Sequence, residues 1–372
     1  MGNTVNQINT SRRNFIKASL TGTGSLSIAL VLPGCQSLHT HELHNNGSWE
    51  ANAWLEITTD NRLIFTLDRV EMGQGTYTGL TTLIAEELDT APELFEVVFA
   101  PAETVYRNRD YGLQLTGGSN SLSSSWQVLR ETGALAKLLL LKSASDVFQV
   151  PVDHLRIDNK HVLHIGSNNK ISFGELCKIA AKQSLPSEIP LKNKSEFKFI
   201  GKKSKRLDSK LKVTGQANYG IDIDMPGMRY AVVSRAPVYG AKATSHNGQS
   251  LAGQDGVEAV INIESGVALV AKTYWQARKA QKKLSIEWSK DTHVAKNMAD
   301  VFSLYRETAR NDAGDVKRSE GDVEDVLEND HETHRSEFTT PYLAHATMEP
   351  MNCTAHVQKN RVDIWTSTQA PD

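Results

Sequence analysis

Two glycine-rich stretches carry residue types that can hold a phosphorylated, heterocyclic ligand. In "EMGQGTYTG", two glycines without a Cβ let a ligand approach the backbone, and the glutamine between them offers an amide donor and a carbonyl acceptor for a heterocycle edge. The second stretch, "TGGSNS", precedes a helical pattern, and the free N–H groups at a helix start favour a phosphate. The candidate cofactor-binding residues are Gly73, Gln74, Gly75, Gly117, Gly118, Ser119 and Ser121.

Neither stretch is specific by itself. An isolated GxG sequence is more often a structural turn than a binding site. The second stretch lacks the GxGxxG spacing of a dinucleotide fold, and GxxxxGK[ST] occurs nowhere in the chain. The hydrolase patterns GxSxG and HExxH are also absent from the sequence. The residue patterns therefore disfavour nicotinamide binding, nucleoside-triphosphate binding and the hydrolase mechanisms that these motifs mark.

A third group of candidates lies in "YLAHATMEPMNC". His345, Glu349 and Cys353 are four residues apart, so on a helix they would share one face and could bind a metal ion. Pro350 opposes a continuous helix there. The favoured interpretation is an extended loop in which Glu349 makes structural hydrogen bonds, and metal binding is the alternative.

The elements that must position the first two stretches form an α+β unit over residues 49–190. Alternating apolar residues around Asp60 and Asn61 predict a hairpin, and the apolar spacing in "GLTTLIAEELD" predicts a helix. A strand "FEVVFA" follows, and then a long helix over about residues 124–143. A second hairpin around Asn159 and Lys160 and a short helix beginning near Ser172 complete the unit.

The rest of the chain predicts a second, smaller α+β domain and a further β segment. Residues 191–205 are rich in lysine and are interpreted as a solvated linker, and residues 206–290 show short strands with one helix near residues 274–283. Residues 291–333 are polar, charged and partly helical, as expected of a surface connection. Residues 334–372 predict strands on either side of a turn at Lys359 and Asn360.

Composition excludes several classes of protein. The 372 residues are 39% hydrophobic and 23% charged, which is typical of a globular protein with a large core. The net charge of −2 supplies no field for attracting nucleic acid. The three cysteines, Cys35, Cys177 and Cys353, are too widely spaced for a CxxC pair or a four-cysteine metal site. Any iron–sulfur cluster that works with this chain must therefore lie on another chain.

The N-terminal 35 residues show an export pattern. Arg12 and Arg13 precede Phe15 and Lys17, and a short, weakly apolar stretch follows that is too polar for a stable membrane span. This pattern resembles the twin-arginine signal, which predicts a location in the periplasm or at the periplasmic face of the inner membrane. "LPGC" leaves lipidation of Cys35 as an alternative to cleavage nearby or to an uncleaved anchor. Residues 36–48 are interpreted as a histidine-containing linker.

Four stretches resemble recurrent segments of the molybdenum hydroxylase large subunits in the xanthine dehydrogenase and aldehyde oxidase superfamily, and the isoquinoline 1-oxidoreductase β-subunit type in particular. The stretches occur in the family's order, and with the export signal they cover essentially the whole chain. They are "RVEMGQGTYTGLTTLIAEELD", "TGGSNSLSSSWQVLRETGALAK", "RLDSKLKVTGQANYGIDIDMPGMRYAVVSRAPV" and "PYLAHATMEPMNCTAHV". The resemblance implies the N-terminal part of a molybdopterin-binding domain, an α/β hammerhead domain over 206–290, and the start of a further molybdopterin-binding domain at 334–372.

The resemblance also implies a function. The family binds molybdopterin cytosine dinucleotide and hydroxylates N-heterocycles or aldehydes with water as the oxygen source. Gln74 and its two flanking glycines would then lie along the cofactor near the molybdenum or pterin end, and the "TGGSNS" residues would approach its phosphates or pterin. The implied partners are an iron–sulfur small subunit, a cytochrome c acceptor, a separately encoded C-terminal half and a small-molecule substrate.

The resemblance covers only the N-terminal half of a family large subunit. The family's catalytic glutamate lies in the later half, and no residue here is assigned to that role, Glu349 included. We therefore expect no turnover from this chain alone. Two alternatives stay open: an inert remnant or accessory module without turnover, and a phosphate-binding periplasmic protein without a redox role, which uses only the two loops.

Overall fold

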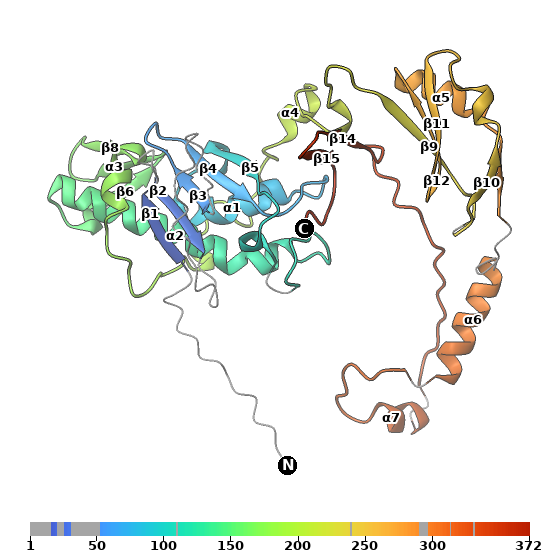
Figure 1. Cartoon of the computed structure of the whole chain (residues 1–372). Coiled ribbons are helices and arrows are strands. Elements are labelled where there is room, and N and C mark those ends of the chain that lie inside the picture. Colours follow the sequence, from blue (N-terminus) through green and yellow to red (C-terminus); the bar gives the residue numbers. More distant parts are fainter. Residues whose placement is uncertain are drawn as a thin grey trace. The chain divides into compact units, whose positions relative to one another are not determined.

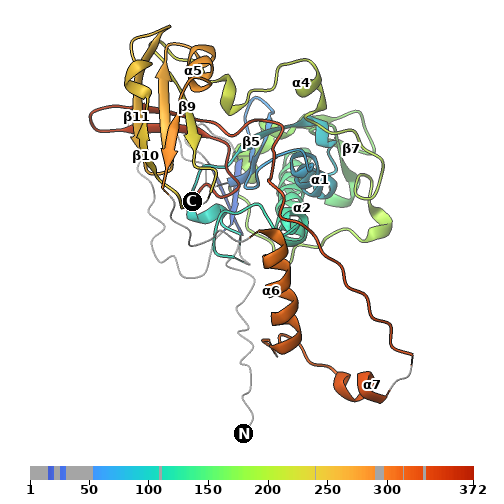
Figure 2. The ribbon, with the colours of Figure 1, turned by 90° about the vertical axis from the view of Figure 1, so that its right-hand side faces the viewer.

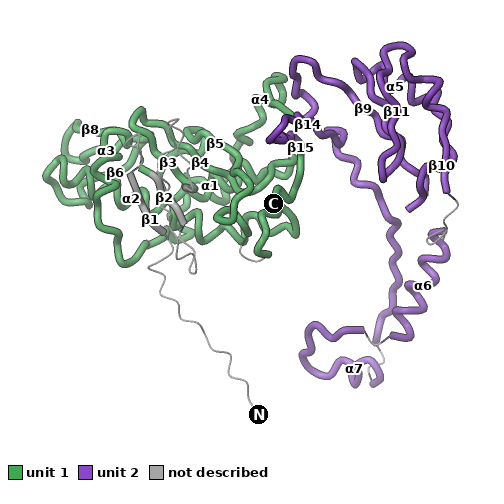
Figure 3. Tube along the Cα trace, in the orientation of Figure 1, with its two compact units in different colours: residues 1–219, 366–372 green, residues 220–365 purple. Residues whose placement is uncertain are grey.

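The computed structural model describes eight stretches of the chain: residues 16–20, 26–30, 53–108, 111–238, 240–289, 297–312, 314–329 and 332–372. The chain divides into two compact units (Figure 3). Unit 1 comprises residues 1–219 together with Thr366–Asp372, and unit 2 comprises Gly220–Trp365. The twin-arginine pair, Cys35 and the 36–48 linker lie outside the described residues.

Unit 1 is built on a five-stranded sheet in the order β1-β2-β3-β4-β5 (Figure 1). The first four strands pair antiparallel and β5 pairs parallel with β4. The predicted hairpin is confirmed as β3–β4, with Asn61 in the left-handed conformation at its turn. The strand bounds are Ile16–Leu20, Leu26–Leu30, Ala53–Ile57, Leu63–Leu67 and Phe95–Phe99. The apolar part of the expected export signal thus contributes two strands to this sheet.

Two helices, α1 (Thr76–Leu88) and α2 (Ser121–Phe148), pack side by side in unit 1, as both Figures 1 and 2 show. α2 extends beyond the predicted 124–143 at both ends. Gly133 allows the close approach of the helices, because a Cβ there would lie 2.4 Å from the carbonyl oxygen of Ile84. The buried faces of both helices join the strands in one apolar core. The sheet and this helix pair fix the positions at which both glycine loops leave the core.

A second, three-stranded sheet and helix α3 complete unit 1. The sheet order is β6-β7-β8, and the predicted turn between β6 and β7 is confirmed, with Asn159 and Lys160 both at positive φ. Ser172 and Glu175 form a reciprocal capping box at the start of α3, which is the local reason for a helix beginning there. The bounds are Leu155–Asp158, His161–His164, Lys170–Ser172 and, for α3, Phe173–Ala180.

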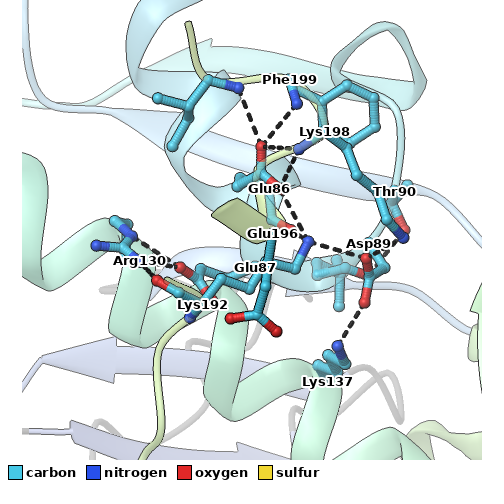
Figure 4. A network of polar contacts seen from close by, with 12 residues as sticks. Glu86, Glu87, Asp89, Thr90, Arg130, Lys137, Lys192, Glu196, Lys198 and Phe199 are labelled. Atoms are coloured by element: carbon cyan, nitrogen blue, oxygen red, sulfur yellow. Dashed lines mark hydrogen bonds and ion pairs between the residues drawn. The ribbon is translucent and has the colours of Figure 1, made fainter. Parts of the chain in front are cut away.

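A buried ionic network ties residues 192–200 to α1 and α2 (Figure 4). Glu86, which is fully buried, accepts hydrogen bonds from the Lys192 ammonium at 2.9 Å and from the backbone N–H groups of three successive residues, Lys198, Phe199 and Ile200. The expected solvated linker is therefore wrong for this part of the lysine-rich run. The ammonium groups of Lys192 and Lys198 pair with carboxylates that lie far away in the sequence.

Two further acidic side chains extend this network. Glu87 accepts a hydrogen bond of 2.7 Å from Arg130, whose guanidinium also lies 5.1 Å from the ring centre of Trp126. Asp89 pairs with Lys137, with Lys192 and with Lys198. Burial works to raise the pKa of Asp89, but hydrogen bonds from these three ammonium groups hold it well below its ordinary value. Asp89 is therefore ionised at neutral pH.

Residues 206–219 differ from the expected short strands. They belong to unit 1, and they include a short helix, α4 (Ser209–Val213), which ends in a turn with Gly215 at positive φ. Short strands were expected over residues 206–290, but a helical turn forms at this point. The Asp208 carboxylate and the Lys212 ammonium pair across it at i,i+4.

Unit 2 contains a three-stranded sheet in the order β11-β12-β9 and a two-stranded sheet, β10-β13. The predicted helix is confirmed as α5, and the 353–366 hairpin is confirmed as β14–β15. The surface connection contains α6 and α7, neither of which has a buried residue. The bounds are Tyr230–Arg235 (β9), Ala243–His246 (β10), Val257–Ile263 (β11), Gly266–Ala271 (β12), Tyr274–Gln281 (α5), Ile286–Trp288 (β13), Met298–Asn311 (α6), Val323–Asn329 (α7), Cys353–Val357 (β14) and Val362–Thr366 (β15). Within the described stretches, no helix has the length and apolar character to cross a membrane.

Candidate functional site

The first glycine loop is an open turn between the sheet and α1. Gly73 and Gly75 adopt φ values of 105° and 95°, which only glycine reaches without strain. A Cβ placed on either residue would meet nothing within 4 Å, so open space lies beside both Cα atoms. Gln74 between them is exposed. This loop therefore offers bare backbone to a ligand, as the sequence predicts.

The Glu71 carboxylate holds the backbone of this loop in place. It accepts hydrogen bonds from the backbone N–H groups of Gly73 at 2.7 Å, Gly75 at 3.2 Å and Tyr77 at 2.9 Å. Burial favours a higher pKa for Glu71. The hydrogen bonds from the backbone, of which that from Tyr77 has the largest effect, and the Arg206 charge together lower the pKa below its ordinary value. Because an ionised side chain already occupies the start of α1, that helix end is not available to a ligand phosphate.

The Gln74 side chain turns back onto its own loop. Its oxygen accepts from the Met72 N–H at 2.7 Å, and its nitrogen donates to the Val70 carbonyl at 2.8 Å. A glutamine amide has a second N–H and a second lone pair, so one donor and one acceptor position remain for a ligand. The predicted contact of Gln74 with a cofactor must use these remaining positions.

The second glycine loop lies at the start of α2. Gly118 and Ser119 both adopt positive φ, at 63° and 54°, and such a conformation is uncommon for serine. Gly117 has open space beside it except for Leu115, at 3.8 Å. Asn120 stands at the N-cap of α2 without capping it, and its oxygen accepts from the Asn108 side chain at 3.3 Å. The first turn of α2, which begins at Ser121, therefore has no side-chain cap and suits an anion.

Direct hydrogen bonds hold the two loops next to each other. The Val70 N–H donates to the Thr116 hydroxyl at 2.8 Å, and the Arg69 guanidinium donates to the Ser124 hydroxyl at 3.2 Å. Thr116 is itself fixed by the last residues of the chain, since its N–H donates to the Gln369 carbonyl and its carbonyl accepts from the Gln369 amide. The structure thus links the segments that lead into the two predicted glycine loops, within unit 1.

A buried ion pair lies beneath these loops. Asp68 and Arg69, which are 4% and 3% exposed, pair with each other. Burial raises the pKa of Asp68 to about 6, and the neighbouring Arg69 charge limits that rise. One Asp68 oxygen and the Arg69 Nε have no hydrogen-bond partner. The site therefore contains a carboxyl group that titrates near neutral pH.

The third group of candidates, His345, Glu349 and Cys353, lies in unit 2. Glu349 accepts hydrogen bonds from the Ile221 N–H at 3.2 Å and the Asn352 amide at 2.9 Å, which confirms the predicted structural role. No cluster of three or more histidine, cysteine, aspartate or glutamate side chains in the described part of the chain could hold a metal ion. Cys177 is buried and Cys353 is exposed, both as free thiols.

Comparison with known families identifies the group to which this arrangement belongs. A family model described as molybdopterin cofactor-binding domain matches residues 7–225, which is more than half of the chain. The chain belongs to the molybdopterin cofactor-binding domain family. A second molybdopterin cofactor-binding domain model matches residues 305–372. Both loops lie inside the first match, and Gln369, which fixes Thr116, lies inside the second. The mixed α and β architecture and the molybdopterin-binding character of both parts are thus confirmed.

Three curated proteins are similar to this molybdopterin-binding chain. They are the isoquinoline 1-oxidoreductase β-subunit of Brevundimonas diminuta (28% identity, 97% of this chain, 52% of the relative), a nicotinate dehydrogenase subunit of Pseudomonas putida (28%, 84%, 26%), and the membrane-bound aldehyde dehydrogenase [pyrroloquinoline-quinone] of Gluconacetobacter polyoxogenes (26%, 98%, 48%). The chain spans about half the length of the isoquinoline oxidoreductase and aldehyde dehydrogenase relatives and about a quarter of the nicotinate dehydrogenase subunit. The resemblance to molybdenum hydroxylase large subunits is thereby confirmed.

Sequence reasoning missed two residues that shape the first glycine loop, Glu71 and Arg206. Glu71 had a local signal, because an acidic residue just before a glycine turn and a helix is typical of a helix N-terminus. Arg206 donates to the Gly73 carbonyl from 133 residues further along the chain. No periodicity or local motif connects those two positions.

Proposed function

We propose that this chain is the molybdopterin-binding part of an exported oxidoreductase that hydroxylates N-heterocycles or aldehydes with water as the oxygen source. The observation that carries the proposal is the hydrogen bond from Val70 to Thr116, which joins the segments that lead into the two glycine loops. Family membership supplies the cofactor class, and the relatives' names supply the substrate classes. We further propose the cytosine dinucleotide form of the cofactor, and a hammerhead domain over 206–290.

The residues present fit such a cofactor. A pterin needs an open backbone surface, and a phosphate needs an anion site. The first loop offers open backbone, and the second loop offers an anion site. Gly73 and Gly75 offer open backbone, and Glu71 already occupies the helix start behind them. Gly117, Gly118 and Ser119 precede α2, which begins at Ser121 without a side-chain cap. We therefore assign the pterin to the first loop with Gln74, and the phosphates to the second.

When bound, the molybdenum cofactor supplies the two-electron oxidation of the substrate carbon. The contribution of this chain is binding and orientation. The remaining amide donor and acceptor of Gln74 hydrogen-bond with the pterin edge, and the N–H groups at the start of α2 hold the phosphates. The link between Val70 and Thr116 keeps the two contacts at a fixed separation, so that the cofactor is held at both ends.

The proposed partners follow from the same assignment. The described cysteines are two isolated thiols, so we propose that an iron–sulfur small subunit receives the electrons and passes them to a cytochrome c acceptor. Export by the twin-arginine pathway rests on Arg12 and Arg13. Replacing both with lysine should abolish recovery in the periplasm, and undiminished recovery would contradict this route.

Cofactor content of the purified chain tests the proposal. The full chain should be produced in a host that makes the molybdenum cofactor, and molybdenum and pterin should be measured by mass spectrometry and by pterin fluorescence. Gly117→Leu fills the open space at the second loop without backbone strain, and Gly166→Leu is the matched control, at an exposed glycine in the same unit. We expect molybdenum and pterin in the wild type and in the control, and loss of both in Gly117→Leu. Equal content in the two variants, or none in the wild type, would refute the proposed site.

A further inference from the structure

Arg206 joins the first glycine loop to a distant part of unit 1. Its Nη1 donates to the Gly73 carbonyl at 2.6 Å, and its Nη2 donates to the Glu71 carboxylate at 3.1 Å. The backbone N–H of the next residue, Leu207, donates to the Thr78 hydroxyl in α1 at 3.0 Å. Two successive residues thus bind the loop and the helix that follows it.

The other side of the guanidinium is also fixed. Its Nε and Nη2 donate to the two oxygens of Asp208, at 3.0 Å and 2.8 Å, which is a bidentate arrangement that a lysine ammonium cannot reproduce. Lys212 pairs with the same carboxylate at 2.6 Å. Glu71, Arg206, Asp208 and Lys212 therefore form a line of alternating charges that ends at the loop.

Burial makes this line sensitive to the loss of its central cation. The side chains of Glu71 and Asp208 are 5% and 7% exposed, while that of Arg206 is 37% exposed. Without Arg206, Lys212 would be the one cation left in the line beside two nearly buried carboxylates. The Gly73 carbonyl would lose its donor at the same time. The loop would then have to rearrange or admit water.

We propose that Arg206 is a positioning residue for the cofactor, which holds Gly73 and Gly75 in the open conformation that receives the pterin. This inference rests on the proposed function for the identity of the ligand, but not for the clamp itself. A loop held in its binding conformation loses less conformational entropy when the ligand binds. Loss of the clamp should therefore loosen the loop and weaken retention of the cofactor.

Two variants and a matched control test the inference on the full chain. Arg206→Met removes the fork and Arg206→Lys keeps the charge. Arg62→Met removes an exposed ion pair elsewhere in unit 1, in which two guanidinium nitrogens donate to one Glu96 oxygen. The first readout is hydrogen exchange of residues 71–78 in the cofactor-free protein. We expect roughly tenfold or faster exchange there in Arg206→Met, a smaller increase in Arg206→Lys, and no change in the control. Core peptides of β4 and α2 should be unaffected.

The second readout is the fraction of pterin that each purified variant retains after gel filtration. We expect retention to fall in the same order in which loop exchange rises. Unchanged loop exchange in Arg206→Met would overturn the clamp, and a loosened loop with unchanged retention would overturn the positioning role. If Arg206→Met does not fold, Arg206→Lys decides by the same criteria. A wild type without pterin would refute the proposed function, and the exchange readout would still decide on the clamp.

Discussion

Replacing Glu86 with glutamine should destabilise unit 1 strongly, although the two side chains have nearly the same shape. The Glu86 Oε1 accepts from Lys192, and the Oε2 accepts from the backbone of Lys198, Phe199 and Ile200. Glutamine has one acceptor oxygen. If that oxygen serves the three backbone N–H groups, the new NH₂ group faces the Lys192 ammonium, donor against donor.

The structure sets the size of the effect. One charge-assisted hydrogen bond is lost, the backbone hydrogen bonds become neutral, and Lys192 keeps a 2.9 Å contact with Asp89. Breaking a buried ion pair on one side costs about 3–5 kcal/mol. For a unit of this size, that corresponds to a fall in melting temperature of roughly 6–20 °C. The matched control is Glu196→Gln, an exposed carboxylate in the same segment that bonds only to Asn193 and should shift the melting temperature far less.

Thermal unfolding monitored by circular dichroism measures the shift, and hydrogen exchange over residues 192–200 shows whether this segment detaches. Acid provides a second check. Burial works to raise the pKa of Glu86, but its hydrogen bonds with Lys192 and the backbone lower it below the ordinary value, so its stabilisation is present above about pH 4.5 and is lost as the pH falls further. The advantage of the wild type over Glu86→Gln should therefore shrink below that pH. Equal melting temperatures for Glu86→Gln and Glu196→Gln at pH 7 would refute this account of the network.

Two further predictions concern the core of unit 1. Because burial raises the pKa of Asp68 to about 6, its protonated form stabilises the fold below about pH 4, and that stabilisation of about 3 kcal/mol is lost as the pH rises through 6. Asp68→Asn should remove this pH dependence in urea titrations between pH 4.5 and 7.5, and an unaltered profile would contradict it. Gly133→Ala should destabilise by about 1–3 kcal/mol, because its Cβ would lie 2.4 Å from a backbone oxygen of α1. Gly166→Ala, at an exposed position, should be close to neutral in the same urea titration, and equal effects of the two substitutions would show that the helices do not approach as described.

Local sequence determined most elements of unit 1. The β3–β4 and β6–β7 turns have residues that tolerate positive φ, and α3 begins at a capping box whose two residues are three apart. The glycines of the first loop were predictable for the same reason, since their backbone conformation depends on their own lack of a side chain. Such features depend on residues that are close together in the sequence, so patterns of residue type are enough to predict them.

Predictions from local sequence patterns were wrong at two places in unit 1. Residues 206–290 were expected to hold short strands and one helix near residues 274–283, but residues 209–213 form a further helix, α4. The lysine-rich segment was expected to be solvated, but Lys192 is 10% exposed and paired with Glu86. In the second case a charged residue is buried because its partner lies 106 residues away in the sequence, and composition alone cannot reveal such a partner.

The sequence by itself determined the two glycine loops, the helices and strands that flank them, and, through four recurrent segments, the molybdopterin-binding family. Only the tertiary structure decided how the loops are held. The bond from Val70 to Thr116 spans 46 residues and the bond from Arg206 to Gly73 spans 133. Hydrogen bonds between residues so far apart form only after the sheet and helices have packed, because the fold itself brings their donors and acceptors within reach.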